Sequence, residues 1–327
     1  MRTATGEPRA IGLDIGGTKI AGGVVTAGGR VLDQTRVPTP PADQAATLAA
    51  MVAVVDELRA RHPQVDAIGV GAAGMVEWPR GRLRWAPHNA YRGLELRRLL
   101  HERTGLPTIV DNDARAAAWA EARFGAGAGT DDLVLVAVGT GIGGGLVLGG
   151  AVYRGTAGLG GEVGHMIVAP DGDSCDCGNR GCLEAMASGS ALGRAAREAA
   201  ARDPGGRLAT LAGGPQRVTG EIVFQAAKEG DETAIALFQR TGYWLGIGIA
   251  SLITIFDPDV VVVGGGLAAT GDLLLTPARA SMERFVFGRA HRELPPVAPA
   301  RLGGAAGLVG AAALALRAGL GHARRPE

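Results

Sequence analysis

The three cysteines of the chain, Cys175, Cys177 and Cys182, lie within eight residues, and His165 stands ten residues before the first of them. One imidazole nitrogen and three sulfurs form a complete ligand set for a closed, tetrahedral Zn²⁺ site. Because such a site leaves no position open for water or substrate, the metal would be structural. We therefore predict a zinc-binding loop over residues 165–184, with three free thiols in a loop as the alternative.

A second candidate for chemistry is Asp113, which lies in the segment "VDNDARAAAWAEA", where an expected strand ends and a helix begins. A carboxylate at this place either caps the helix or lies at the mouth of an α/β cleft, where it can accept the proton of an attacking hydroxyl. The residues alone leave both interpretations open. Asp111, two residues earlier, is expected to be structural.

Three glycine-rich loops are candidates for binding a phosphate or a nucleotide. In "DIGGTK", Asp14 to Lys19, two glycines at a corner between strands let backbone N–H groups approach an anion, and a plain hairpin turn is the alternative. "VGTGIGGG", Val138 to Gly145, contains G-x-G-x-x-G, but a strand follows where a dinucleotide-binding loop requires a helix. It is therefore expected to be a phosphate cradle. "VGGGLA", Val263 to Ala268, is either part of a nucleotide site or a simple turn between strand and helix.

The pattern of apolar residues predicts an α/β protein whose two halves share one plan. Each half opens with three strands joined by glycine turns and continues with alternating helices and strands. The glycine-rich stretch Phe124–Asp132 marks the expected boundary, which gives domains over residues 1–126 and 127–303 with a cleft between them. Helices are expected over residues 43–62, 189–201, 219–228 and 231–256.

The composition excludes several classes of protein. Lys and Arg number 33 against 32 Asp and Glu, so no basic face for nucleic acid or an anionic membrane is expected. The longest apolar run, Leu245–Phe256, is too short to span a bilayer. The N-terminus carries no apolar signal segment and the number of cysteines is odd, so we expect a cytoplasmic protein without a disulfide framework.

Four segments, "IGLDIGGTKIAGGVV", "GTGIGGGLVLGG", "GLGGEVGHMIV" and "CDCGNRGCLEAMASG", together resemble the ROK (repressor, open reading frame, kinase) family over nearly the whole chain. The resemblance is to its sugar kinases, and most of all to its bacterial glucokinases of the actinobacterial type. It implies a two-lobed α/β fold of the actin/hexokinase-like (duplicated ribonuclease-H-like) class, in which a C-terminal helix over residues 304–320 completes the first lobe. It also implies ATP-dependent phosphorylation of a hexose, at the C6 hydroxyl for glucose, with Mg²⁺ and a structural Zn²⁺, in a homodimer or homotetramer.

The resemblance further assigns roles to residues of this chain. Asp113 matches the general base, and Asp14 matches a position that contacts Mg²⁺ indirectly. The ligands matched to the structural zinc are His165, Cys175, Cys177 and Cys182. The positions matched to sugar binding are Gly74, Asn89, Asn112, Asp113, Glu162, His165 and Glu184. The positions matched to nucleotide binding are Asp14, Gly16, Gly17, Thr18, Lys19, Thr140, Gly141, Gly264 and Gly265.

Two alternatives to a glucokinase stay open within the resemblance. "GAAGMV" and "APHNAYRG" depart from the common family pattern on the sugar side, so the sugar could be N-acetylmannosamine, fructose or allose, and polyphosphate could replace ATP. The family also contains sugar-responsive transcriptional regulators. Those carry a winged-helix domain before the first strand, whereas here only the residues before Ala10 precede it, so a regulator is disfavoured.

Overall fold

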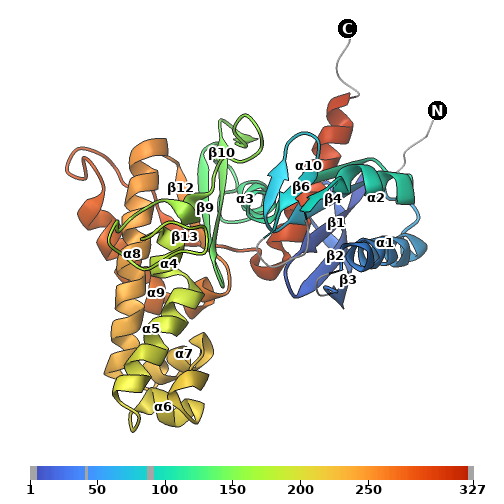
Figure 1. The fold of residues 1–327 in the computed structure, drawn as a ribbon. Helices are drawn as coiled ribbons and strands as arrows, with labels where there is room; N and C mark the ends of the chain where they lie inside the picture. Colours follow the sequence, from blue (N-terminus) through green and yellow to red (C-terminus); the bar gives the residue numbers. More distant parts are fainter. Residues whose placement is uncertain (1–5, 41–42, 87–91, 323–327) are drawn as a thin grey trace. The chain divides into compact units, whose positions relative to one another are not determined.

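The computed structural model describes residues 6–40, 43–86 and 92–322 (Figure 1). They divide into two compact units. Unit 1 holds the described parts of Met1–Leu135, Gly145–Gly161 and Arg301–Glu327, and unit 2 holds Val136–Gly144 and Glu162–Ala300. The predicted α/β class is confirmed, because helices pack around two five-stranded sheets.

The sheet of unit 1 has the strand order β3-β2-β1-β4-β8. β1 pairs antiparallel with β2 and parallel with β4, and β4 pairs parallel with β8. In this register Ile15, Ala72 and Asn112 are neighbours, so the segments that follow three strands begin at one edge of the sheet. The strands are β1 (Arg9–Ile15), β2 (Lys19–Thr26), β3 (Val31–Pro38), β4 (Ala67–Ala72) and β8 (Thr108–Asn112).

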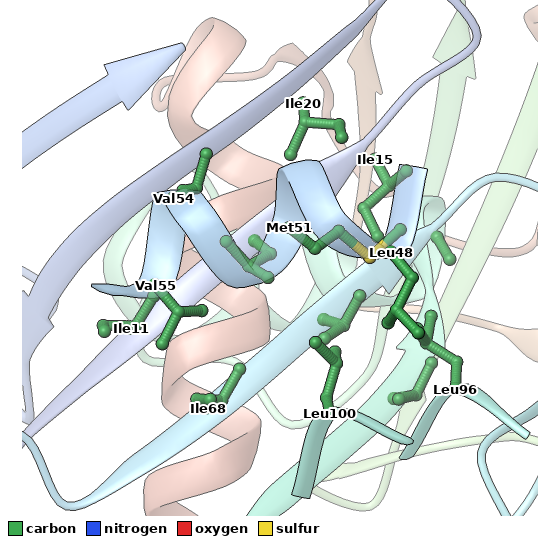
Figure 2. Close-up of a cluster of buried hydrophobic side chains, with 14 of the residues drawn as sticks. Ile11, Ile15, Ile20, Leu48, Met51, Val54, Val55, Ile68, Leu96 and Leu100 are labelled. Carbon is green, nitrogen blue, oxygen red and sulfur yellow. The ribbon is translucent and has the colours of Figure 1, made fainter. Parts of the chain in front are cut away.

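The two faces of this sheet carry side chains of different size. On one face, large residues pack against α1 (Gln44–Arg61) and α2 (Leu96–Thr104), as Figure 2 shows. On the other face, small residues of β1 and β4 lie against α3 (Asp113–Phe124) and α10 (Ala306–His322). This difference follows from the alternation of side chains along a strand. The large residues of the central strands are Ile11, Leu13, Ile15, Ile68 and Val70, and the small ones are Ala10, Gly12, Ala67, Gly69 and Gly71.

Glycines bring the backbone of α10 into direct contact with the sheet and with α3. A methyl group on Gly12 would lie 1.9 Å from the carbonyl oxygen of Leu308, and one on Gly69 would lie 1.8 Å from that of Ala311. On the helix itself, a methyl group on Gly310 would lie 1.7 Å from the carbonyl oxygen of Ala116 in α3. A side chain at any of these positions would force the elements apart.

The second sheet repeats the plan of the first, in the order β11-β10-β9-β12-β13. Three consecutive strands are again neighbours, and a fourth and a fifth strand extend the sheet beside the first of them. The division between the units falls within β9 and β10. The strands are β9 (Leu133–Val138), β10 (Ile142–Leu148), β11 (Ala151–Val152), β12 (Val260–Gly264) and β13 (Val297–Pro299).

Unit 1 also contains a small three-stranded sheet that was not predicted from the sequence. Its strands are β5 (Met75–Glu77), β6 (Arg82–Trp85) and β7 (Arg92–Leu94). Strands of three or four residues are too short to show an alternating pattern.

In unit 2 the long helix α8 (Glu232–Phe256) packs against α9 (Asp272–Phe285) and α4 (Leu183–Ala187). Glycines again allow the contact, since a methyl group on Gly246 would lie 2.3 Å from the carbonyl oxygen of Ala278. Among the described residues, no helix combines the length and the hydropathy needed to cross a membrane. The other helices are α5 (Gly189–Arg202), α6 (Arg207–Ala212) and α7 (Gly220–Lys228), and the helices expected at 43–62, 189–201, 219–228 and 231–256 are confirmed within two residues.

We expect Gly310→Ala to destabilise the protein by about 1–3 kcal/mol, because the added methyl group has no space against Ala116. Gly304→Ala is the matched control, since a methyl group there meets nothing within 4 Å. Urea unfolding of both variants measures the difference. Equal stability of the two variants would contradict the close packing of α10.

Candidate active site

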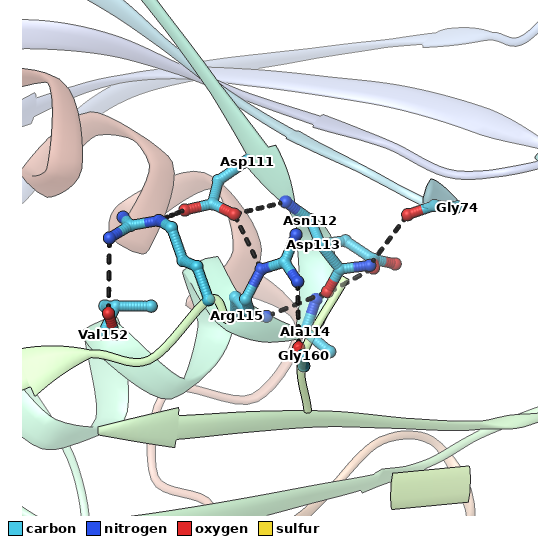
Figure 3. A network of polar contacts seen from close by, with 9 residues as sticks. Gly74, Asp111, Asn112, Asp113, Ala114, Arg115, Val152 and Gly160 are labelled. Atoms are coloured by element: carbon cyan, nitrogen blue, oxygen red, sulfur yellow. Dashed lines mark hydrogen bonds and ion pairs between the residues drawn. The ribbon is translucent and has the colours of Figure 1, made fainter. Parts of the chain in front are cut away.

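Asn112 and Asp113 lie where β8 ends and α3 begins (Figure 3). Asn112 is the N-cap of the helix, because its Oδ1 accepts a hydrogen bond of 3.1 Å from the Arg115 N–H. Its Nδ2 donates to the carbonyl oxygen of Gly74 at 3.2 Å. The cap is therefore Asn112, and Asp113 is left as the first helical residue, with its Oδ1 accepting from the Ala114 N–H at 2.9 Å.

A buried carboxylate, Asp111, precedes this pair in the chain and lies beside it (Figure 3). Its Oδ1 accepts from Arg115 Nε at 2.8 Å and from the Asn112 N–H at 2.8 Å. Its Oδ2 accepts from Arg154 Nε at 2.7 Å. The Arg154 guanidinium also lies over the ring of Trp78, 3.9 Å from the ring centroid. Two arginines thus neutralise one carboxylate that is 1% exposed.

This network fixes the loop that follows Arg154 in unit 1. Arg115 Nη1 donates to the carbonyl oxygen of Gly160 at 3.2 Å, and the Trp78 N–H donates to that of Ala157 at 3.3 Å. A methyl group on Gly158 would lie 2.5 Å from the Trp78 nitrogen, so the loop lies on the backbone of the small sheet. The loop and the start of α3 are therefore held as one piece.

Asp14 and Asp113 are the titratable groups of this part of unit 1 whose pKa values are shifted. Burial raises the pKa of Asp14 to about 6, the negative charge of Asp113 adds to the rise, and Lys19 opposes it. Burial also raises the pKa of Asp113, and it outweighs the Ala114 N–H and the charge of Arg115, which both lower that pKa. Burial disfavours the anionic forms of these two neighbouring carboxylates. Their oxygens are the ligand type that a hard divalent cation such as Mg²⁺ prefers.

In unit 2, His165 and the three cysteines form a cluster whose ligand atoms all lie within 4.8 Å of one another. Cys175 Sγ is 3.7 Å from His165 Nδ1, and Cys177 Sγ is 3.6 Å from Cys182 Sγ. Tetrahedral coordination of Zn²⁺ at ordinary bond lengths separates such ligand atoms by about 3.5–3.8 Å. The predicted residues are therefore brought together in a geometry that fits a metal ion.

The charge state of the cluster points to the same conclusion. Burial and the neighbouring sulfurs of Cys177 and Cys175 raise the pKa of Cys182 to about 12, and burial also raises the pKa of Cys175. Burial therefore disfavours the thiolate form of these two residues. A divalent cation between the sulfurs would supply the positive charge that stabilises the thiolates.

The glycine loop between β9 and β10 lies against the helices that follow the cysteine loop. Glu184 Oε2 accepts from the Ile142 N–H at 2.7 Å, and the Gly189 N–H donates to the carbonyl oxygen of Gly139 at 2.8 Å. Gly265 has a φ of +85°, and a methyl group there would lie 2.4 Å from the carbonyl oxygen of Val138. Two of the three predicted nucleotide loops are therefore adjacent in unit 2.

The predicted residues fall into two groups, one in each unit, and Asn89 lies outside the described residues. The group of unit 1 is Asp14, Gly16, Gly17, Thr18, Lys19, Gly74, Asn112 and Asp113. The group of unit 2 is Thr140, Gly141, Glu162, His165, Cys175, Cys177, Cys182, Glu184, Gly264 and Gly265. Sequence reasoning missed Arg115 and Arg154. The spacing of Asp111 and Arg115, four residues apart on a strand end and a helix, was a signal for that pair alone.

Comparisons with known proteins agree with this geometry. The model of the ROK family matches residues 10–318. A glucokinase of Streptomyces coelicolor is 42% identical over 93% of this chain and 96% of its own. The solved structure of a ROK family glucokinase from Streptomyces griseus in complex with glucose and AMPPNP has a TM-score of 0.85 and 43% identity, over 94% of this chain and 99% of that one. A ROK hexokinase from Thermus thermophilus has a TM-score of 0.80 and 38% identity, over 96% and 99%.

The raised pKa of Asp14 predicts how Asp14→Asn changes stability with pH. In the folded protein the charged form of Asp14 is disfavoured, so the wild type loses stability as pH rises from about 4 to 6, and the neutral amide does not. In ligand-free buffer without Mg²⁺, we expect the Tm of Asp14→Asn to exceed that of the wild type by roughly 3–6 °C at pH 8 and to equal it at pH 4. Asp56→Asn, on the exposed side of α1, controls for the loss of a surface charge. A lower Tm for Asp14→Asn at pH 8 would refute the buried charge.

Proposed function

The chain belongs to the ROK family, and we propose that it is an ATP-dependent glucokinase that phosphorylates the C6 hydroxyl of glucose. The expected hexokinase-like α/β fold is confirmed by the solved ROK kinases. The similarity to a glucokinase solved with glucose and an ATP analogue, over 94% of this chain, is the observation that carries the substrate assignment.

Asp113 is the general base of the proposed reaction. A sugar hydroxyl is a weak nucleophile, so a carboxylate within about 2.6–3.2 Å must accept its proton as the bond to phosphorus forms. Burial raises the pKa of Asp113 and so makes its carboxylate a stronger base than an exposed aspartate. The cap made by Asn112 and the Ala114 N–H fix its position at the start of α3.

Each unit has glycine loops whose backbone N–H groups and side chains suit a nucleotide. Gly16 to Lys19 form the corner between β1 and β2, where the Gly16 N–H is bound to the Lys19 carbonyl oxygen and Thr18 and Lys19 are exposed. Thr140 and Gly141 would receive phosphate oxygens, and Gly264 and Gly265 the adenosine. Asp14 would contact a bound Mg²⁺ indirectly, and that ion would supply positive charge to the phosphates.

The cysteine cluster would hold a structural Zn²⁺ that orients the sugar-binding side chains. His165 directs Nδ1 toward the Cys175 sulfur, which leaves its other ring nitrogen, Nε2, for a sugar hydroxyl. Glu162 begins the turn Val163–His165, so fixing His165 also fixes the segment that carries Glu162. A carboxylate and an imidazole placed in this way select for a ring with the matching hydroxyl groups.

A coupled assay of ADP release across a panel of hexoses tests the proposal. We expect glucose to give the highest kcat/KM, and Asp113→Asn to lose at least three orders of magnitude in kcat while its Kd values for glucose and AMPPNP change by less than about threefold. Asp56→Asn serves as the exposed control. No stimulation by any sugar would reject the kinase assignment, and normal turnover of Asp113→Asn would reject the base.

Metal analysis of the purified protein should find one zinc per chain. Cys177→Ser should lose the zinc and lower the Tm, because a hydroxyl is a poor replacement for a thiolate ligand. Asp176 is exposed and lies between two of the ligands in the chain, so Asp176→Asn should keep the zinc and the wild-type Tm. A stable and active wild-type protein that contains no metal would contradict the structural role of the cluster.

A further inference from the structure

Glu184 makes a contact that its predicted role in sugar binding does not explain. It lies in the first turn of α4, two residues after Cys182, and is partly buried. Its Oε2 accepts from the Ile142 N–H at 2.7 Å, and a methyl group on Gly141 would lie only 2.2 Å from the same oxygen. The carboxylate is therefore packed on the backbone of the glycine loop that is predicted to hold phosphate.

Two further hydrogen bonds also hold the same loop. The Gly189 N–H donates to the carbonyl oxygen of Gly139 at 2.8 Å, and the Ser190 N–H donates to that of Thr140 at 3.1 Å. Both donors are backbone groups at the start of α5. Of these three contacts, only the one made by Glu184 uses a side chain, so a substitution can remove it alone.

The loop needs such support because of its composition. Residues 139–145 hold five glycines, and a glycine-rich backbone loses much conformational entropy when it is ordered. A hydrogen bond from a backbone N–H to a carboxylate is stronger than one to a neutral acceptor, so it is suited to fix the loop. The carboxylate also brings negative charge near a phosphate site, which a purely anion-binding role would avoid.

We propose that Glu184 is a positioning residue that couples the sugar to the phosphate loop. One carboxylate oxygen fixes the Ile142 N–H, and the other accepts a hydrogen bond from a hydroxyl of the bound sugar. The sugar thereby holds Glu184 in place, and Glu184 holds the loop in the form that receives the phosphates of ATP. This inference rests on the proposed function, and it adds that sugar and nucleotide increase each other's affinity by an equal factor.

Isothermal titration of AMPPNP with Mg²⁺, with and without saturating glucose, tests the coupling. In the wild type we expect glucose to lower the Kd of AMPPNP at least fivefold. Glu184→Ala should weaken AMPPNP binding about tenfold without glucose and lose the effect of glucose. Glu184→Gln keeps an oxygen for the Ile142 N–H, so its AMPPNP affinity without glucose should stay within about threefold of the wild type. Glu198→Ala, an exposed glutamate of α5, should behave as the wild type.

Two outcomes would overturn the coupling. One is a Glu184→Ala variant that loses glucose affinity and keeps the nucleotide affinity and its response to glucose, since Glu184 would then be a sugar contact alone. The other is a Glu184→Gln variant, folded by circular dichroism, that loses AMPPNP affinity without glucose. A separate result would reject the proposed function itself: a wild-type protein whose release of ADP is not stimulated by glucose.

Discussion

The salt bridges of one buried carboxylate organise the part of unit 1 on which the proposed chemistry depends. Asp111 is held by Arg115 at 2.8 Å and by Arg154 at 2.7 Å, and it also accepts the Asn112 N–H. Breaking a buried pair by removing one partner costs about 3–5 kcal/mol, because the other charge is left without compensation. The start of α3 and the loop after Arg154 therefore keep one arrangement.

A second constraint is the small size of the residues on one face of the first sheet. Gly12 and Gly69 let α10 lie on the strands, and Gly310 lets the same helix lie on α3. The same face carries Asp14, and a methyl group on Gly307 would lie 2.7 Å from the Cγ atom of Asp14. Close packing thus buries Asp14 near Asp113, and burial is the main cause of its raised pKa. The packing that stabilises unit 1 therefore also shifts the pKa of Asp14.

The parts of the molecule that local patterns determine could be predicted from the sequence. The helices follow from apolar periodicity and caps, and the metal cluster follows from the spacing of His165 and three cysteines, because a metal loop is a local structure. The three short strands after β4 could not be predicted, since they are stabilised by pairing and not by their own pattern.

Contacts between segments far apart in the chain could not be predicted either. Arg154 meets Asp111 across 43 residues, and Glu184 meets Ile142 across 42. Nothing in either segment specifies its partner, because such pairs are fixed by the tertiary fold. The family resemblance predicted Glu184 as a sugar contact because it lies in the cysteine motif. The structure additionally shows its hydrogen bond to the glycine loop. The roles of the sugar-binding and nucleotide-binding residues stay predictions.

If Asp113 accepts the proton of one hydroxyl of the hexose, the γ-phosphoryl group of ATP is transferred to that hydroxyl alone. Carbon-13 NMR of the product made from uniformly labelled glucose and ATP measures where the phosphate is attached. We expect a single phosphorylated sugar in which coupling to phosphorus appears at C6. A product phosphorylated at C1, or a glucose spectrum that does not change while the protein is folded and loaded with its metals, would contradict it.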